Sequence, residues 1–568
     1  MRSNLTLNYG VRYDVEFTPT FSPLNSIAAF AQNALGIGQG IPRDFNNVAP
    51  RIGLAWDPGK DGKSVIRASY GLFYDHPLLA LAFDSDVADA SQAPQIVLFP
   101  GAPGNCSLNA SNAFQGLLSC LPPAFNYLPN EQRFNPTPNA PSIFVGQAYL
   151  NPTSPVPLAI QPFGFPVGKN FQYGSSQQAN LTYERELGHN LSLGLEYNFN
   201  GGRHLNRPIN VNAVKSQFLI ANWQAAVATA TALGIQPSDP NFPSNPLAVG
   251  TQDPTIFPPC GAASPSGPFY VPAALVSFFR PSGFNPSLMG LYAPCVPLAT
   301  QVLQADGLMS NCDPTTLANC VPFSDMPGNF SSGSSVYHGF TANLKKRFGQ
   351  HYEFLGSYTW SHTIDDSTDL QSPLEPQDNY DLRAERSNSL FDQRHRFVFS
   401  GVYQSGTLSG GFWSKFLSDW TVAPIIEAAS GRPFNIITGD DRNFDFSTPT
   451  DRPLIVASGT GPNSCGDVAA ASRFSPTGFL QPACFLDGTL SGNLGRNAGT
   501  KPINVFTDIR VSKRIHLGER VALDGLVDAF NFINRFNVAD VNPLWDSSQK
   551  ATAAFDPRQV QFALKLTW

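Results

Sequence analysis

Apolar and polar residues alternate with a period of two along much of this chain. The C-terminal stretch "RQVQFALKLTW" (558–568) shows the pattern most clearly, because every second residue from Val560 to Trp568 is apolar. Residues 5–15 repeat it near the N-terminus, with Asn8 and Arg12 among the intervening polar positions. Successive side chains of a β-strand point to opposite faces, so this alternation predicts strands with one apolar and one polar face.

The alternating stretches are joined by turn residues, as in hairpins. Two long stretches, 179–199 and 337–361, each turn back in the middle, at "GHN" and at Gly349-Gln350. We predict about twelve strands of roughly nine to thirteen residues in total. The remaining ones are 50–57, 63–75, 394–403, 419–430, 503–534 with a turn at "LGE", and the two terminal stretches.

The connections between these strands are sorted by length. Tight turns near 58–62, 188–190, 349–351, 405–418 and 518–519 alternate with long connections near 16–48, 76–172, 200–335, 364–392, 431–502 and 534–557. Because antiparallel strands alternate in direction, all the tight turns fall at one end and all the long loops at the other. This asymmetry is typical of short periplasmic turns and long extracellular loops. The sequence therefore predicts an all-β fold, an antiparallel transmembrane β-barrel meander in the Gram-negative outer membrane.

Aromatic residues and cations near the strand ends agree with this fold. Arg185, Lys346 and Lys513 break the alternation, but each lies close to a tight turn, where a long side chain can reach lipid headgroups. Aromatic residues at both strand ends predict two interfacial girdles. They are Trp56, Tyr352, Tyr403, Trp420 and Trp568 on the turn side, and Tyr74, Tyr197, Tyr337 and Trp360 on the loop side. A soluble secreted β-protein, including an enzyme, is the alternative, and it leaves both girdles unexplained.

Composition narrows the function classes further. Charged residues make up 14% of the chain and the net charge is −6, with no basic block, so no nucleic acid is expected as a partner. No apolar run approaches the ~18 residues that a membrane-spanning helix needs. The start, "MRSNLTLNYG", has no apolar signal-peptide core, so we expect the exported protein to begin upstream of this sequence.

The eight cysteines all lie in the predicted long connections. Their even number and their Pro/Gly-rich surroundings favour disulfides in an oxidising compartment over unrelated free thiols. The pairing itself is suggested only by proximity along the chain. It would join Cys106 with Cys120, Cys260 with Cys295, Cys312 with Cys320, and Cys465 with Cys484.

Motifs for chemistry are missing from the sequence, so we expect neither an enzyme nor a cofactor. No HExxH, GxSxG or P-loop pattern occurs, and His395 is expected to be a structural residue at a strand start. The stretches 214–234 and, more weakly, 22–36 are candidate helices. Two acidic groups suit solvated loops better than Ca²⁺ sites: Asp365, Asp366 and Asp369, and Asp440, Asp441 and Asp445. Inward polar residues expected to line a wet lumen are Arg12, Arg67, Glu184, Glu196, Asp508 and Arg510.

A series of phrases resembles the C-terminal β-barrel of TonB-dependent outer-membrane transporters, specifically the Oar-like group. They are "LTLNYGVRYD" (5–14), "NNVAPRIGLAWDP" (46–58), "SVIRASYGLFYD" (64–75), "FLGSYTWSHTIDD" (354–366), "FDQRHRFVFSGVY" (391–403), "GNLGRN" (492–497) and "DAFNFINRFN" (528–537). The resemblance implies that the barrel-assembly machinery recognises the terminal strand. The assembly signal would be Phe562, Leu564, Leu566 and Trp568.

The resemblance also implies parts that this sequence does not show. Large transporters of this type have 22 strands, so residues 1–568 resemble the C-terminal portion of such a barrel, without its plug domain. TonB would act only through that missing N-terminal plug region. We expect a fragment of a longer protein, and hence an incomplete barrel wall against outer-membrane lipid. A shortened barrel that closes with twelve strands is the alternative.

Two classes of function remain open at this point. In the first, the barrel belongs to a TonB-dependent receptor that takes up a ligand through a plugged lumen. Its long extracellular loops would then capture an unidentified ligand, and their size suits a bulky one such as a glycan, a peptide or a protein. In the second, the protein is an outer-membrane adhesin or a surface-structural barrel without transport, or a passive porin-like channel.

Overall fold

The computed structural model describes all of the predicted strand regions and part of the connections. The described residues are 4–18, 35–38, 40–76, 81, 95–96, 162–163, 166–216, 223–224, 227–228, 230–239, 242, 326–349, 351–367, 375–407, 410–439, 441–443, 445, 451–455, 474–475, 478–479, 485–486, 492–518, 520–545 and 551–568.

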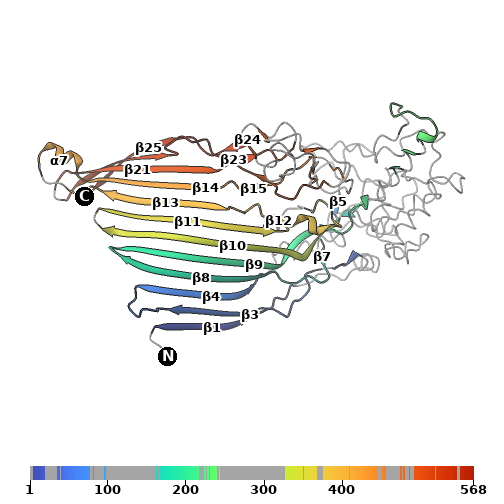
Figure 1. Cartoon of the computed structure of the whole chain (residues 1–568), viewed down its shortest axis with the longest axis horizontal. Helices are drawn as coiled ribbons and strands as arrows, with labels where there is room; N and C mark the ends of the chain where they lie inside the picture. Colours follow the sequence, from blue (N-terminus) through green and yellow to red (C-terminus); the bar gives the residue numbers. More distant parts are fainter. Residues whose placement is uncertain are drawn as a thin grey trace, which may run out of the picture.

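Twelve antiparallel strands form one meandering sheet (Figure 1). Each of them pairs with its neighbours in this series, on one side only for the first and the last strand, which confirms the predicted meander. The strands are β1 (Leu5–Tyr13), β3 (Val48–Trp56), β4 (Ser64–Tyr74), β8 (Ser175–Gly188), β9 (Leu191–Asn210), β10 (Pro327–Gly349), β11 (Tyr352–Asp365), β13 (His395–Gln404), β14 (Trp420–Ala429), β21 (Asn504–His516), β22 (Ala522–Phe530) and β25 (Gln559–Thr567).

The sheet does not close on itself. Among the described strands, β1 pairs only with β3, and β25 pairs only with β22. Every residue of β1 and of β25 is exposed. Figure 1 shows these two strands at opposite margins of the sheet. The structure is therefore an open barrel-like wall with two unpaired edges, as the sequence predicted.

The tight turns all lie at one end of the sheet, on the left in Figure 1, and the long connections leave from the other end. The turn between β8 and β9 consists of His189 and Asn190, whose φ angles are 54° and 61°. Positive φ at both positions is the signature of a type I′ turn, whose twist matches that of the flanking strands. One connection differs from the prediction, because the turn between β13 and β14 contains a short helix, α7 (Phe412–Leu417).

Two central strands are longer than the sequence predicted. β9 has 20 residues and β10 has 23, and their pairing continues from Asn210 opposite Pro327 at the loop end. The register of this pair shifts between Phe330 and Gly333 and again before Ser335. The additional residues lack clean alternation because the bulges break the period of two. This extension carries the wall beyond the predicted strand ends.

Short elements fill the loop end. They are β2 (Ile37–Gly38), β5 (Gln95–Ile96), β6 (Pro162–Phe163), β7 (Val167–Gly168), η5 (Leu382–Glu385), β12 (Ser387–Asn388), β15 (Pro433–Phe434), β16 (Leu454–Ile455), β17 (Phe474–Ser475), β18 (Gly478–Phe479), β19 (Phe485–Leu486), β20 (Gly499–Thr500), β23 (Val538–Val541) and β24 (Ala551–Ala554).

The buried hydrophobic core sits in the connections at the loop end rather than within the sheet. One cluster joins Phe434, Ile436, Leu494, Val538 and Val541. A second cluster joins Ile41, Leu81, Val167, Phe171 and Tyr173. The described residues of 375–394, 430–455, 492–503 and 531–545 are termed the loop layer below. The last three of these segments share the apolar side chains of the first cluster, and Gln377 and Glu385 of the first segment bond to Arg452, so the loop layer is a packed structure of its own.

Within the helix predicted at 214–234, the described positions 216, 223–224, 227–228 and 230–232 are helical, whereas 214–215 are not and 233–234 form a turn. Gly234 has a φ of 76°, and its N–H donates to the carbonyl of Thr231 at 3.0 Å, which caps the C-terminus as predicted. The other candidate, 22–36, lies outside the described residues except for its last two positions. Within the described part of the chain, no helix has the length and apolarity to cross a membrane.

Candidate functional site

One face of the sheet is apolar across its whole width. The register places Leu7 opposite Leu54, Leu181 opposite Tyr197, and Val527 opposite Phe562 on this face. A continuous, exposed apolar surface of this kind requires a non-aqueous neighbour. The residues proposed as the assembly signal belong to it: Phe562, Leu564 and Leu566 by register, with Trp568 following at the turn end, 87% exposed.

Apart from Tyr74, which packs against the buried cluster that contains Phe171 and Tyr173, the predicted aromatic girdles lie on the apolar face with one exception. At the turn end Trp56 is opposite Leu5, and Tyr352 is opposite Tyr403. At the loop end Tyr197 and Trp360 are both opposite Phe340. The exception is Tyr337, whose assignment to the girdle is wrong. It is opposite Asn200 and Thr363 on the polar face, because the even-numbered residues of β10 are the apolar ones in this register.

Two of the three lysine and arginine exceptions donate to backbone carbonyls at the turn end, which the sequence did not reveal. The ammonium of Lys346 donates to the carbonyl of His189 at 2.6 Å and lies 5.4 Å from the centre of the Tyr352 ring. Lys513 lies 5.4 Å from the Trp420 ring and donates to carbonyls at the end of α7. Lys346 is buried, so it fastens a turn instead of reaching a headgroup as predicted. Arg185 lies on the apolar face opposite Leu193.

Ion pairs between neighbouring strands cover the opposite, polar face. They are Arg67–Glu184 at 2.5 Å, Arg396–Glu427 at 2.9 Å, Arg510–Asp528 at 2.6 Å and Arg514–Asp524 at 2.7 Å. The arginines are about half exposed, so solvent reaches these pairs. Arg12 bonds Asp14 at 2.6 Å, and Asp508 accepts the N–H of Asn531 at 2.9 Å. The structure thus places the predicted lumen residues on one polar, water-accessible surface.

A hydrogen-bonded ladder of polar side chains extends this surface across β8 and β9. The amide nitrogen of Asn180 donates to Glu196 at 2.9 Å and to Asn198 at 2.7 Å. The hydroxyl of Thr182 donates to the Asn180 carbonyl oxygen at 2.8 Å. These mutual contacts hold the side chains in one arrangement, which suits a wall exposed to water rather than to lipid.

A group of apolar side chains interrupts the polar face on β11, β13 and β14. Leu355 and Ile425 lie on either side of Ser400, and Val398 lies on the same face between Ser357 and Glu427. Leu355 and Ile425 are 40% and 53% exposed. We term Leu355, Val398, Val402 and Ile425 the inward apolar patch. The sequence pattern did not reveal it, because it breaks the alternation on which the strand prediction rested.

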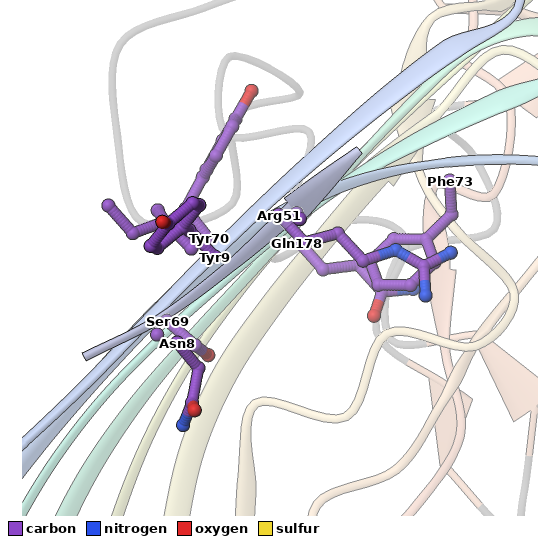
Figure 2. A pocket seen from close by; sticks show the side chains of 11 residues that line it. Asn8, Tyr9, Arg51, Ser69, Tyr70, Phe73 and Gln178 are labelled. Atoms are coloured by element: carbon purple, nitrogen blue, oxygen red, sulfur yellow. The ribbon is translucent and has the colours of Figure 1, made fainter. Parts of the chain in front are cut away.

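A shallow hollow of about 440 Å³ lies near the edge strand β1 (Figure 2). The guanidinium carbon of Arg51 lies 4.3 Å from the centre of the Phe73 ring beside it. Figure 2 shows Tyr9 and Tyr70 on one side of the ribbon and Arg51 and Phe73 on the other. Its lining therefore comes from both faces of the sheet, so the hollow is a thin part of the wall rather than an enclosed binding site.

Charged side chains buried in the loop layer connect its segments to one another. Arg452 donates to Glu385 through both terminal nitrogens, at 3.1 and 2.8 Å, and through Nε to the carbonyl of Leu494 at 2.7 Å. Arg496 forms an ion pair with Asp365 at the end of β11 and donates to the carbonyl of Glu385 at 2.7 Å. These contacts join the loop layer to the rim of the wall and fix it there.

Asp451 is a buried acid within the same layer. It accepts the backbone N–H of Asn443 at 2.8 Å and that of Arg442. Burial is the largest of the effects that together raise the pKa of the Asp451 carboxyl to about 7: the two N–H donors lower this pKa, and the neighbouring carboxylates Asp445 and Asp441 raise it. The loop layer therefore contains a group that titrates near neutral pH.

The remaining predicted residues have structural partners or lie outside the described part of the chain. Asp366 accepts the N–H and the hydroxyl of Ser334 at 2.7 and 2.8 Å. His395 begins β13 and bonds the Tyr358 hydroxyl at 2.8 Å, as expected of a structural residue. Asp369, Asp440 and all eight cysteines lie outside the described residues. Among the described residues, no group of three or more His, Cys, Asp or Glu side chains is arranged to hold a metal ion.

Comparison with known proteins gives a family match and several similar structures. A family model described as "Outer membrane beta barrel domain" matches residues 1–561. The chain is similar to the outer membrane transporter YddB from Escherichia coli, with 8% identity over 99% of this chain and 43% of that one, and a TM-score of 0.40. No curated protein matches the sequence.

Two further similar structures are receptors. The ferric enterobactin receptor PfeA from Pseudomonas aeruginosa, solved as a mutant, shows 9% identity over 92% of this chain and 40% of that one, with a TM-score of 0.36. The siderophore receptor PirA from Acinetobacter baumannii shows 8% identity over 92% of this chain and 41% of that one, with a TM-score of 0.35. The chain spans about two fifths of the length of these three proteins.

Proposed function

Because the chain belongs to the outer membrane beta barrel domain family, we propose that its sheet is the C-terminal part of the barrel wall of a TonB-dependent receptor. Such a receptor imports its ligand through a lumen closed by a plug. The protein lies in the Gram-negative outer membrane. The apolar face of the sheet then contacts lipid, and the face with the ion pairs lines the lumen. The proposal assigns no catalytic step to the chain.

The inward apolar patch is the observation that carries this proposal. A lumen filled with water would leave Leu355 and Ile425 solvated at 40% and 53% exposure. Burying a side chain of this kind contributes about 1.5–3 kcal/mol, so a protein element packed in the lumen would gain from covering them. A plug domain is such an element. The patch therefore favours a plugged receptor over a passive porin-like channel.

The loop layer supports a receptor in a second way. Arg452, Glu385 and Arg496 hold segments from different loops in one fixed arrangement at the loop end of the wall. A fixed surface binds a ligand with less loss of conformational entropy than a mobile loop would. The long extracellular loops are accordingly the proposed ligand-capturing part, for a bulky ligand such as a glycan, a peptide or a protein.

The two unpaired edges support the assignment of the chain to part of a wall. The N–H and C=O groups along the outer sides of β1 and β25 have no strand partner among the described residues. Within lipid, unpaired backbone groups of this kind cost several kcal/mol each. Further strands that pair with both edges would remove that cost. We propose that these strands belong to the same protein and precede β1.

The first experiment is to measure the mass of the native protein in detergent-extracted outer membranes, with an antibody against the C-terminal strand. The proposal predicts a band well above 61.4 kDa, the mass of this chain. A band at 61.4 kDa that resists urea extraction would overturn it in favour of a short barrel without a plug.

A second experiment separates the receptor from its alternatives. The native protein inserted into a planar lipid bilayer should show no steady ion conductance, because the plug closes the lumen. It should also bind the periplasmic domain of TonB in a pull-down assay. Steady conductance would indicate a porin-like channel. Absence of both conductance and TonB binding would indicate an adhesin or a surface-structural barrel.

A further inference from the structure

The helix α7 (Phe412–Leu417) at the turn end is amphipathic, although it is short. Its sequence "FWSKFL" places Phe412, Trp413, Phe416 and Leu417 within one arc of the helix, since residues one and four apart lie on neighbouring lines of its surface. Ser414 and Lys415 occupy the opposite arc. A helix with this division of its surface has one side suited to an apolar environment and one suited to water.

The apolar side of α7 is a cluster of aromatic rings in mutual contact. The Phe412 ring lies 5.5 Å from that of Trp413 and 6.4 Å from that of Phe416. The Phe416 ring lies 6.3 Å from that of Trp420 at the start of β14. The cluster is nevertheless uncovered, because Phe412 and Trp413 are 73% and 71% exposed. Large aromatic side chains left this open mark a surface that contacts something else.

Two contacts fix α7 on the lipid side of the wall rather than over the lumen. The indole N–H of Trp420 donates to the carbonyl of Phe416 at 2.7 Å. The ammonium of Lys513 donates to the carbonyls of Lys415 and Phe416 at 2.9 and 3.0 Å, and to that of Ser418. Trp420 and Lys513 are opposite each other on the apolar face of the sheet. Figure 1 shows α7 beyond the strand ends, beside the C-terminus.

Lys513 also supplies hydrogen-bond donors to the carbonyl groups at the C-terminal end of α7. The last carbonyls of a helix lack intrahelical partners, and a cation beside them satisfies both their hydrogen bonds and the negative end of the helix dipole. By taking up three such carbonyls from a neighbouring strand, Lys513 sets the orientation of α7 relative to the wall. The aromatic cluster is thereby held in a defined position.

We propose that α7 is an interfacial anchor, whose aromatic side inserts into the phospholipid leaflet that surrounds the turn end of the barrel. The cluster continues the row of turn-side aromatics on the lipid-facing side through Trp420, so the same leaflet reaches both. Rings of Trp and Phe are favoured at the boundary between headgroups and acyl chains. The anchor fixes the depth of this side of the wall in the membrane.

The test uses the native protein, purified from outer membranes and reconstituted in vesicles of phosphatidylethanolamine and phosphatidylglycerol. Subtracting the tryptophan emission of the Trp413→Phe variant from that of the wild type isolates the Trp413 signal, and the replacement keeps an aromatic ring in place. Lipids brominated near the headgroup end of the acyl chain should quench this signal strongly, and aqueous iodide should quench it little. Quenching by iodide without quenching by bromolipid would overturn the proposal, and so would protection from both, which would indicate a protein partner.

A second variant tests the positioning role of Lys513. Replacing it by methionine keeps an unbranched side chain but removes the donor to the α7 carbonyls. The Trp413 signal should then become accessible to iodide, while the matched variant Lys415→Met, on the polar side of α7, should leave it protected. Unchanged bromolipid quenching in Lys513→Met would contradict the role assigned to Lys513.

Discussion

Arg452 and Glu385 form a bidentate ion pair inside the loop layer, and their side chains are 2% and 4% exposed. The two residues come from different loops, so the pair fixes one loop against the other. The backbone N–H of Arg452 also donates to the side-chain oxygen of Gln377 at 3.0 Å. A buried, bidentate pair with further hydrogen bonds is a rigid contact, and its loss leaves a charge without a partner.

Replacing Arg452 by methionine should therefore open the loop layer without unfolding the wall. Removing one partner of a buried ion pair costs about 3–5 kcal/mol, because the remaining charge stays buried. We expect faster hydrogen exchange at backbone amides of the loop layer and unchanged exchange in the strands β21 and β22. Hydrogen exchange followed by mass spectrometry measures both regions in one sample.

The matched control is Arg67→Met on the polar face of the wall. Arg67 pairs with Glu184, but both side chains are 50% exposed. Solvent screens such a pair, and its contribution is about 0–1 kcal/mol. Loss of protection of similar size in both variants would show that the loop layer does not depend on the buried pair.

The pKa of Asp451 makes the loop layer sensitive to pH. Burial is the main cause that raises this pKa to about 7 from its ordinary value of 3.8. The folded layer therefore holds the proton more tightly than the unfolded chain does. The stabilising contribution is fully present below about pH 3.8 and decreases as the pH rises to about 7. The loop layer should thus open more readily at pH 8 than at pH 5.

Exchange of the Arg442 and Asn443 amides, which donate to Asp451, is the direct measurement. After correction for the intrinsic pH dependence of exchange, their opening free energy should fall between pH 5 and pH 7. The variant Asp451→Asn keeps a side-chain acceptor and cannot ionise, so its opening free energy should be flat over this range. An equal slope in the wild type and in this variant would assign the effect to another group.

The sheet could be predicted because one physical rule, the alternation of apolar and polar side chains along a strand, governs most of it. Strand alternation and loop sorting depend on local sequence, and they gave the number, order and direction of the strands. Tyr337 shows the limit of the rule. It lies close to the apolar Phe340 in sequence, but a register defined by pairing with β9 and β11 puts it on the polar face.

The parts that were not predicted depend on contacts between residues far apart in the chain. Arg452 and Glu385 are separated by 67 positions, and no local pattern relates them. The inward apolar patch likewise combines single residues from three strands. A signal for α7 was present in "GGFWSKFLSDW" (410–420), where apolar residues recur one and four positions apart, but it is only one turn and a half of helix long.

The two faces of the last strand should respond differently to charge. Phe562 lies on the apolar face opposite Val527, and the residue before it, Gln561, lies on the polar face opposite Asp528. Lysine on a lipid-facing position near the bilayer midplane costs about 2–4 kcal/mol, whereas a lumen-facing lysine is solvated. We expect Phe562→Lys to lower the free energy of unfolding by this amount, and Gln561→Lys to change it little.

Urea titrations of the native protein in lipid vesicles, followed by tryptophan fluorescence, measure this difference. Equal losses in the two variants would mean that both faces of β25 contact the same environment. The assignment of lipid and lumen faces would then be wrong at this edge of the wall.

Trp568 provides the last prediction, which concerns assembly rather than stability. It follows β25 with 87% of its surface exposed, and no ring contact or hydrogen bond of its side chain occurs among the described residues. Its replacement by alanine should therefore cost the folded wall little. If the terminal strand is the signal for the barrel-assembly machinery, Trp568→Ala should sharply reduce the amount of protein in the outer membrane of living cells. The same variant should refold in detergent as well as the wild type does.

Thr567→Ala, one position earlier and on the other face, is the matched control and should accumulate normally. Normal accumulation of Trp568→Ala would remove this residue from the signal, and a matching loss of refolding in detergent would assign its effect to the stability of the wall.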